Sequence, residues 1–278
     1  MIKLTCWNIA HRHAAWRSLV ESDADVALLQ EARTPPEDVA DRLNATDPLN
    51  VNARQFQEVN AQKSQCMIVK LTDRVDVKRL IPIPLINARN GEFKSTHPGC
   101  LAAAIITPRD GESFITVSFC PEYEKPHRST GKMSWNIVDA SIHRVISDLS
   151  LLIGNQRGHR IVAAGDLTIY HGYGEDKSGY WKGRYDTVFD RMRALGLPLV
   201  GPQHPHGRQA DPWPDELPED SKNVPTYIHS SQTPETATSQ LDYVFASESM
   251  ADSVEVRALN RPDEWGPSDH CRIEIEVT

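Results

Sequence analysis

Residues 161–168 read Ile-Val-Ala-Ala-Gly-Asp-Leu-Thr, an apolar run that ends abruptly in a carboxylate. Four apolar residues in succession predict a buried strand, so Asp166 would lie at the edge of a buried sheet. A carboxylate in such a position is a candidate for catalysis or metal binding. Taken alone, however, a Gly-Asp pair is equally typical of a turn.

Polar side chains mark the ends of several other apolar runs. These runs are Trp7-Asn8, Leu28-Leu29-Gln30-Glu31, Leu241-Asp242-Tyr243-Val244-Phe245 and Ser268-Asp269-His270-Cys271. Because open sheets gather the side chains at strand ends into a common crevice, these groups can meet Asp166 in one pocket. Four carboxylates, one amide and one imidazole gathered there would be unstable without a cation.

Each of these residues also has a purely structural interpretation. Asn8 suits a turn or a helix cap, and Glu31 suits a solvated strand end. Asp242, inside an apolar strand, needs a cationic or hydrogen-bonding partner if it is buried. His270 is a candidate, since a carboxylate that accepts an imidazole N–H fixes the tautomer and raises the basicity of the ring. The order and neighbours of the segments together carry more weight than any single residue.

Short apolar runs alternate with longer amphipathic ones, which is typical of an α/β protein. They predict strands at 2–8, 25–30, 65–71, 100–107, 113–120, 160–165, 241–247, 254–259 and 271–277. Apolar residues at helical spacing predict helices at 136–153 and 184–195, with weaker signals at 14–21 and 36–44. Helices are too few to alternate strictly with strands, so a mixed sheet or a pair of stacked sheets fits better than an eightfold barrel.

The composition limits the class of protein and the kind of partner. The 278 residues are 39% apolar and 24% charged, which suits one large α/β domain or two small ones. No apolar run approaches the roughly 20 residues needed to cross a bilayer, and the first residues are too polar for a signal peptide, so we expect a cytoplasmic protein without membrane contact. The five cysteines form no Cys-x-x-Cys pair, which argues against a disulfide framework and against a thiolate zinc site. The net charge of −8 argues against tight nonspecific DNA binding.

The ordered set Trp-Asn, Gln-Glu, Gly-Asp-Leu, Leu-Asp-Tyr-Val-Phe and Ser-Asp-His-Cys resembles the endonuclease/exonuclease/phosphatase family, and the match runs from Trp7 to Cys271. The resemblance implies one α/β domain over residues 1–278, a four-layer α/β sandwich in which two mixed β-sheets pack face to face with helices outside. The stretch 202–239, rich in Pro, His, Asp, Ser and Thr, is expected to be a long surface loop. The family acts on diverse phosphate esters, so the resemblance implies fold and mechanism more firmly than substrate.

The resemblance also implies a role for each motif residue. Glu31, with Asn8 and Asp269 close by, would hold a divalent cation, Mg²⁺ or Mn²⁺, which oxygen ligands favour. Asp166 would orient or deprotonate the attacking water. His270, oriented by Asp242, would stabilise or protonate the phosphate oxygens.

Two positions depart from the family pattern. Where the family usually has Asn two residues after the catalytic Asp, this chain has Thr168, whose hydroxyl can donate one hydrogen bond to a phosphate oxygen or to Asp166. Phe119 occupies the strand position where the family commonly has His or Tyr, and a phenyl ring cannot hydrogen-bond. Tyr123 and His127, in the following loop, are candidate substitutes.

Two loops, 121–135 and 171–184, interleave basic and aromatic residues, and their candidate substrate contacts are Lys132, Trp181 and Arg184. The same residues suit the solvation and anchoring of a loop equally well. The sequence favours a metal-dependent phosphoesterase that cuts phosphodiester bonds, either a nuclease or a nucleotide phosphodiesterase, with a nucleic acid or nucleotide as substrate. Two alternatives remain open: a phosphatase of a small soluble ester such as an inositol or sugar phosphate, and a catalytically weak binding protein of the same fold.

Overall fold

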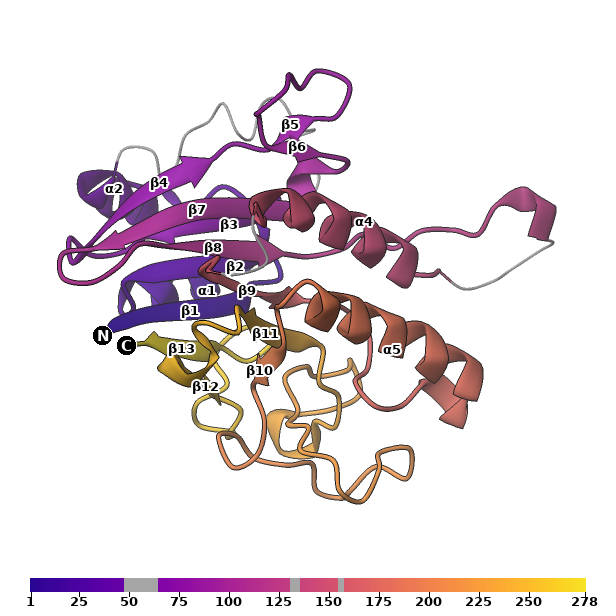
Figure 1. Ribbon diagram of the computed structural model, residues 1–278. Helices are drawn as coiled ribbons and strands as arrows, with labels where there is room; N and C mark the ends of the chain where they lie inside the picture. The colour runs from indigo at the N-terminus through magenta and orange to yellow at the C-terminus, as the bar shows by residue number, and fades with distance from the viewer. Residues whose placement is uncertain (48–64, 131–135, 155–157) are drawn as a thin grey trace.

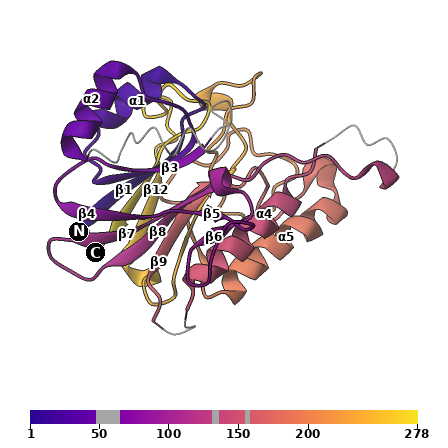
Figure 2. The same cartoon turned by 90° about the horizontal axis from the view of Figure 1, so that it is seen from above.

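The chain forms four layers, with two β-sheets face to face between two pairs of helices (Figure 1). The computed structural model describes residues 1–47, 65–130, 136–154 and 158–278. Helices α1 (His13–Val20) and α2 (Glu37–Thr46) cover one sheet, and α4 (Asp139–Leu149) and α5 (Gly179–Ala194) cover the other (Figure 2). The four-layer α/β sandwich expected from the sequence is thereby confirmed. Among the described residues, no helix combines the length and apolarity needed to cross a bilayer.

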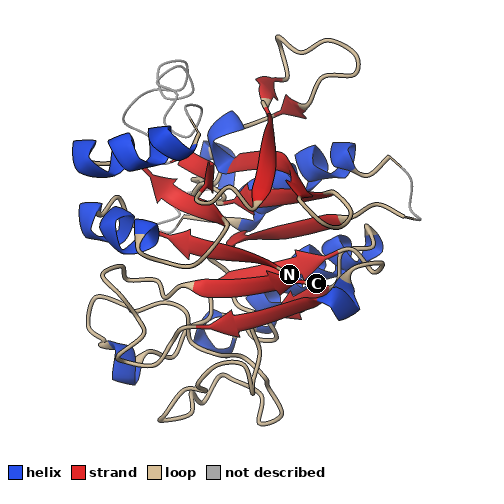
Figure 3. Ribbon diagram, turned by 90° about the vertical axis from the view of Figure 1, so that its left-hand side faces the viewer, coloured by secondary structure: helices blue, strands red, loops and turns tan. Residues whose placement is uncertain are grey.

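The first sheet has the strand order β12-β13-β1-β2-β3. Its strands are β1 (Ile2–Asn8), β2 (Val26–Ala32), β3 (Gln65–Lys70), β12 (Val254–Ala258) and β13 (Ile273–Val277). Strand β1 pairs in parallel with β2 and antiparallel with β13, so the two termini lie side by side at one end of the sandwich (Figure 3). Every residue of β1 except Lys3 is buried, as expected for a strand covered on both faces.

The second sheet has the strand order β10-β11-β9-β8-β7-β4. Its strands are β4 (Val75–Leu80), β7 (Leu101–Pro108), β8 (Phe114–Phe119), β9 (Ile161–Asp166), β10 (Leu199–Gly201) and β11 (Asp242–Ala246). Strands β8 and β9 are parallel, whereas β7 and β11 run antiparallel to their neighbours. A separate two-stranded ladder joins β5 (Ile83–Pro84) to β6 (Lys94–Ser95).

Apolar side chains fill the three spaces between these layers. The space between the sheets contains Leu4, Leu28, Ile106 and Ile275. A second cluster, with Val117, Ile142 and Val188, joins the second sheet to α4 and α5. The third, with Trp7, Trp16 and Leu29, joins the first sheet to α1 and α2. Strands β1, β2, β8 and β9 are therefore clamped on both faces, which fixes the positions of their ends.

Gly165 is required where the parallel strands of the second sheet approach each other. It lies opposite Phe119 in the β8–β9 ladder. A Cβ atom at position 165 would lie 1.9 Å from the Phe119 carbonyl oxygen and 2.8 Å from its carbonyl carbon. These are backbone atoms of a central strand, so they cannot rotate away. Glycine thus allows β9 to end beside β8 with Asp166 at its tip.

Every strand expected from the sequence is present, but the structure adds β4, β5, β6 and β10. Helix α5 begins at Gly179 rather than at 184, because the Ser178 hydroxyl caps it by accepting from the N–H of Trp181 at 3.4 Å. The helix expected at 136–153 begins at Asp139 and ends in the 3-10 turn Ser150–Leu152. The expected loop 202–239 has one regular element, the 3-10 turn Pro234–Thr236, yet Val224 and Thr226 within it are completely buried.

Candidate active site

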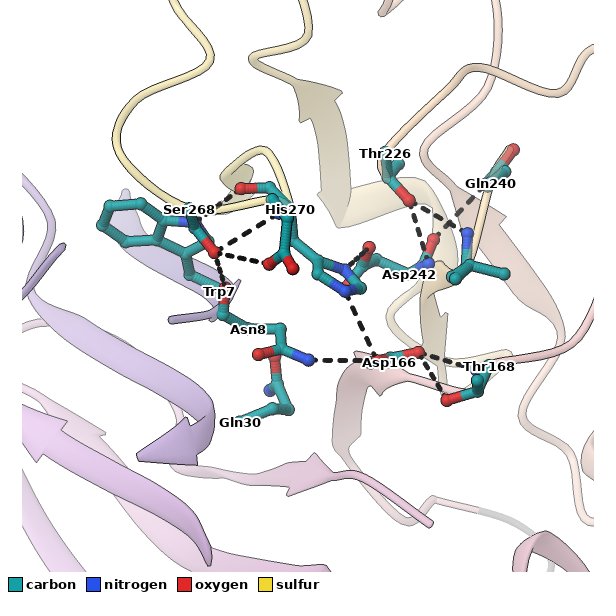
Figure 4. A network of polar contacts seen from close by, with 12 residues as sticks. Trp7, Asn8, Gln30, Asp166, Thr168, Thr226, Gln240, Asp242, Ser268 and His270 are labelled. Carbon is teal, nitrogen blue, oxygen red and sulfur yellow. Dashed lines mark hydrogen bonds and ion pairs between the residues drawn. The ribbon is translucent and has the colours of Figure 1, made fainter. Parts of the chain in front are cut away.

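Strand ends from both sheets meet at one edge of the sandwich (Figure 4). In the first sheet, Asn8 ends β1 and Glu31 lies near the end of the parallel strand β2. In the second sheet, Asp166 ends β9 and pairs directly with Asp242, the first residue of β11. The structure therefore brings polar groups more than 150 residues apart in the sequence to one place, as the pattern of strand ends predicted.

A buried line of carboxylate, imidazole and carboxylate crosses this site. Asp242 Oδ2 lies 2.8 Å from His270 Nδ1, and His270 Nε2 lies 3.7 Å from Asp166 Oδ2. All three residues are at most 4% exposed. Burial lowers the pKa of His270, but the charges of Asp242 and Asp166 outweigh burial and raise that pKa to about 10. The ring is therefore an imidazolium at neutral pH, and its Nδ1 proton is donated to Asp242.

Three hydrogen bonds hold the carboxylate of Asp166. Its Oδ2 accepts from Asn8 Nδ2 at 3.0 Å, and its Oδ1 accepts from the N–H of Thr168 at 2.6 Å and from Thr168 Oγ1 at 3.0 Å. Burial raises the pKa of Asp166 to about 6, with His270 opposing the shift and Asp242 adding to it. A fixed carboxylate with a pKa near neutrality is suited to accept a proton from water.

Asn8 presents its amide nitrogen, not its oxygen, to the carboxylates. Asn8 Oδ1 accepts from the N–H of Ala10 at 3.0 Å, so Nδ2 points at Glu31 Oε1, 3.2 Å away, as well as at Asp166. In this conformation Asn8 orients two carboxylates and offers no oxygen to a cation, which differs from the role expected for it. The Thr168 hydroxyl donates to Asp166, which is one of the two partners expected for it.

Glu31 lies beside Asp166 on an irregular stretch of backbone. The β2–β3 register shifts between Leu29 and Ala32, and Glu31 has a φ of 48°, which side-chain-bearing residues rarely adopt. A carboxylate oxygen of Glu31, one of Asp166 and the sulfur of Cys120 all lie within 4.8 Å of one another. Two carboxylates this close to each other, one of them with a raised pKa, leave an excess of negative charge at this point. The donor set therefore fits a divalent cation.

Cys120 and His11 are neighbours of Glu31 that the sequence did not assign to the site. His11 Nε2 lies 3.4 Å from Glu31 Oε2. Cys120 follows the last residue of β8, and strand alternation directs it to the face opposite that of Phe119. This alternation is the sequence feature from which the position of Cys120 could have been predicted. Phe119 itself is 3% exposed and packs with the α4 and α5 layer, away from the site.

The loop that carries His270 is tied to β1. The indole nitrogen of Trp7 donates to the His270 carbonyl oxygen at 2.9 Å. The Ser268 hydroxyl donates to the Asn8 carbonyl oxygen at 2.7 Å and accepts from the His270 N–H at 3.3 Å. Trp7 and Ser268, which belong to the sequence motifs but had no expected role, therefore fix the imidazole relative to the carboxylates (Figure 4).

The segment 202–239 also reaches the site. The Thr226 hydroxyl accepts from the N–H of Asp242 at 3.1 Å and is completely buried. The ring of Tyr227 packs against the ring of His270, with 4.9 Å between the centroids. This segment was expected to be a surface loop, and its polar composition gave no sign of these contacts.

An open pocket of about 820 Å³ lies beside these residues. Its aromatic lining consists of Tyr123, Tyr170, Trp181, Tyr185 and Tyr227. Its acidic lining consists of Glu31, Asp166, Glu175, Asp176 and Asp269, and His229 and His270 complete the titratable groups. In the described part of the chain, no lysine or arginine lines it. The pocket is thus aromatic and strongly acidic.

Only some of the residues expected to contact substrate lie at the pocket. Trp181 and Thr168 line the pocket. Arg184 does not: its guanidinium makes two hydrogen bonds to Asp139, at 2.7 and 2.8 Å, and lies over the Trp181 ring, so it holds α5 to α4. Lys132 lies outside the described residues. Of the candidate substitutes for Phe119, Tyr123 lines the pocket, whereas His127 is exposed and bonds to Ser129.

Solved structures share this architecture over the whole chain, while no protein-family model and no curated protein matches the sequence. The endonuclease domain of TRAS1, a telomere-specific non-LTR retrotransposon, is 16% identical, with a TM-score of 0.55 over 100% of this chain and 98% of that one. The AP endonuclease LMAP from Leishmania major is 14% identical, with a TM-score of 0.58 over 99% and 87%. The 3'-5' exonuclease NExo from Neisseria meningitidis is 18% identical, with a TM-score of 0.52 over 99% of both chains, and NExo from Neisseria is also described as a 3' phosphatase bound to a product DNA hairpin.

Identities this low establish the shared fold rather than a shared activity. The likeness extends over 99–100% of this chain, which includes both sheets and the helices on either side. The chain therefore has the DNase I-like fold, the four-layer α/β sandwich of these solved structures.

Proposed function

We propose that this protein is a divalent-metal-dependent phosphoesterase that hydrolyses phosphodiester bonds in a nucleic acid or nucleotide. The observation that carries the proposal is the buried line Asp242–His270–Asp166, with the carboxylate of Glu31 beside Asp166 and an open pocket in front of it. An imidazolium next to an oriented carboxylate of raised pKa is costly to bury, and this arrangement supplies an acid and a base at one point.

Glu31 and Asp166, together with Asp269 on the same pocket wall, would hold Mg²⁺ or Mn²⁺. When bound, the cation supplies Lewis-acid stabilisation of the phosphate charge. Burial is the main cause of the raised pKa of Asp166, and the cation would offset the further rise that the charges of Asp242 and Glu31 produce.

Asp166 accepts the proton of the attacking water in this proposal. Its two oxygens are fixed by Asn8 and Thr168, so the carboxylate does not need to reorient before the reaction. Its raised pKa makes it a stronger base than an exposed aspartate and leaves it ionised at neutral pH.

His270 donates to the phosphate. Its Nδ1 proton is taken by Asp242, whereas the 3.7 Å from Nε2 to Asp166 exceeds the length of a hydrogen bond. The Nε2 proton is therefore available to a phosphate oxygen in the pocket, where it stabilises the charge that develops during attack or protonates the leaving oxygen.

The pocket favours a small or single-stranded substrate over long duplex DNA. Its aromatic rings can stack on a base, but the described lining offers no cation for neighbouring phosphates, and the net charge of the chain is −8. A phosphatase of a small ester is the second candidate, and the acidic lining supports it. The rings of Tyr170, Trp181 and Tyr227 favour a substrate that carries a base.

Of the two departures that suggested a catalytically weak binding protein, Thr168 and Phe119, the contacts of Thr168 argue against that alternative. The family's asparagine is missing, but the N–H and hydroxyl of Thr168 both hold Asp166. We also place the protein in the cytoplasm, since none of the five cysteines, all in the described part of the chain, forms a disulfide, which suits a reducing compartment.

The test is a substrate panel with Mg²⁺ or Mn²⁺: plasmid, single-stranded DNA, RNA, dinucleotides, and phosphomonoesters that include inositol and sugar phosphates. The same panel is run with Asp166→Asn, which removes the base, and with Asp263→Asn, which makes the same change at an exposed site. We expect phosphodiester cleavage by the wild type and Asp263→Asn only. Turnover confined to monoesters would select the phosphatase, and no turnover at all would refute the proposal.

A further inference from the structure

Outside the pocket, a histidine, a cysteine and a glutamate converge at the other side of the β8 end. Donor atoms of His97, Cys100 and Glu122 all lie within 4.8 Å of one another. His97 and Cys100 flank the 3-10 turn Pro98–Cys100 that leads into β7, and Glu122 follows β8. None of the three lines the pocket beside Asp166 and His270, so they form a separate cluster.

The backbone of each of the three residues is anchored. Just before His97, the N–H of Thr96 donates to Asp148 Oδ2 on α4 at 2.8 Å, and the Cys100 N–H donates to the His97 carbonyl oxygen at 2.9 Å. The N–H of Glu122 donates to the Ser141 hydroxyl, also on α4, at 2.9 Å. The three donors are therefore held near one another by α4 and by the turn, before any ligand binds.

A ladder bond also ties the cysteine to the strand that precedes Glu122. The N–H of Cys120 donates to the Cys100 carbonyl oxygen at 2.9 Å. This bond continues the β7–β8 pairing, in which Leu101 lies opposite Phe119. The separation of Cys100 and Glu122 is thus set by a central pair of strands rather than by loose loops.

The chemistry of the cluster suits a soft, tetrahedral cation. Cys100 is 3% exposed, and Nδ1 of His97 is buried without a hydrogen-bond partner among the described residues, which is costly for a polar atom. Thiolate, imidazole and carboxylate are the ligands of Zn²⁺, whereas Mg²⁺ takes oxygen ligands. One thiolate and one carboxylate also neutralise the two charges of the ion.

We propose that His97, Cys100 and Glu122 bind one Zn²⁺, which links the start of β7 to the end of β8. Binding releases the proton of the Cys100 thiol to solvent as the Zn–S bond forms, and no group is oxidised or reduced. Three protein ligands leave the fourth tetrahedral position to water. The absence of a Cys-x-x-Cys pair concealed this cluster, because its ligands come from two separate segments, before β7 and after β8, and include a single thiol.

The test uses Zn²⁺ and the spectroscopic probe Co²⁺, added to the chelator-treated full chain. Zinc is counted by atomic emission after gel filtration, and the thiolate-to-Co²⁺ charge-transfer band reports a sulfur ligand. The site variants are Cys100→Ser, His97→Gln and Glu122→Gln. The matched controls are Cys271→Ser, a buried cysteine in the core between the sheets, and Cys120→Ser, which removes the thiol beside Glu31 and Asp166.

We expect one tightly held Zn²⁺ and a charge-transfer band in the wild type and both controls. Cys100→Ser should lose the band, while His97→Gln and Glu122→Gln should keep it and bind Zn²⁺ at least about tenfold more weakly. Thermal melting of the metal-free proteins identifies any variant that fails to fold. If Cys100→Ser or Glu122→Gln fails to fold, the Zn²⁺ affinity of His97→Gln decides the outcome. A band that survives in Cys100→Ser but vanishes in Cys120→Ser, or no band in the wild type, would overturn the proposal.

Discussion

Replacing Asp242 by asparagine isolates what its charge does for His270. The change preserves volume, and the carboxylate it removes lies 2.8 Å from His270 Nδ1. Burial lowers the pKa of His270, and Asp242 makes the largest contribution to the net rise to about 10. Without that charge, we expect the pKa of His270 to return to, or below, the value of about 6.5 of an ordinary histidine.

The consequence is a pH-dependent loss of turnover. At about pH 8 a histidine with a pKa of about 10 is ~99% protonated, whereas one with a pKa of about 6.5 is ~3% protonated. If the protonated ring is the required donor, kcat/KM should fall roughly 30-fold at about pH 8 but less than about twofold at about pH 6. The stability that the wild type gains from protonated His270 is full below about pH 6.5 and is lost as the pH rises toward 10, so the variant should melt earlier than the wild type at about pH 6 and the difference should shrink as the pH rises.

The assay is kcat/KM from about pH 5.5 to 9 with saturating Mg²⁺, on the best substrate from the panel, for the wild type, Asp242→Asn and the exposed control Asp263→Asn. A nuclear magnetic resonance titration of the imidazole gives the pKa independently. If Asp242→Asn reduces activity equally at every pH while the His270 pKa falls, the imidazolium is not the donor, and the mechanism proposed for His270 is wrong.

Four further results are expected. EDTA should abolish hydrolysis, and Glu31→Gln should weaken Mg²⁺ binding in calorimetry without altering the fold; full activity after chelation would exclude metal dependence. Asp166→Asn should lower kcat by about 10²-fold or more. In the wild type, Mg²⁺ affinity should drop roughly tenfold from about pH 7 to about pH 5, because a carboxyl with a pKa of about 6 becomes protonated. An affinity that does not vary with pH would remove Asp166 from the cation site. Thr168→Asn should stabilise the protein by ~1 kcal/mol and preserve turnover, since Thr168 has a φ of 55° that asparagine tolerates better than a β-branched residue; a lower melting temperature would contradict this. Gly165→Ala should destabilise the fold by about 3 kcal/mol or more in urea unfolding, because the new methyl group meets the Phe119 backbone, and an unchanged midpoint would show that β8 can shift.

The parts of the fold that sequence reasoning could reach are those with uninterrupted apolar runs. Strands such as β1 and β9 are buried on both faces, and most of their residues before the polar last one are therefore apolar. Strand β4 escaped because it is an edge strand, in which Asp76, Lys78 and Arg79 alternate with or follow apolar residues. The start of α5 was missed because Gly179 and Gly183 weaken its helical pattern, while the cap that begins it is a single hydroxyl.

Sequence reasoning likewise reached some features of the candidate site and missed others. Asp166, Asp242 and His270 could be singled out because a charged group beside an apolar run needs a reason, and their proximity followed from strand ends. The bonds of the Asn8 amide to Glu31 and Asp166, and those of Arg184 to Asp139, join residues far apart in the sequence, which no local pattern encodes. The sequence alone does not distinguish a lysine or arginine that anchors a helix from one that binds a phosphate.

The pairing of β1 with β13 has a consequence for biosynthesis. Strand β1 lies between β2 and β13, yet β13 leaves the ribosome some 260 residues later. Until then one edge of a strand that is almost wholly buried in the finished fold has no hydrogen-bonding partner, and such edges recruit other strands. We expect the nascent chain to depend on chaperones over this interval and to become resistant to proteolysis only after its last strand is released. The active site, which needs Asn8 and His270 together, would form in that same late step.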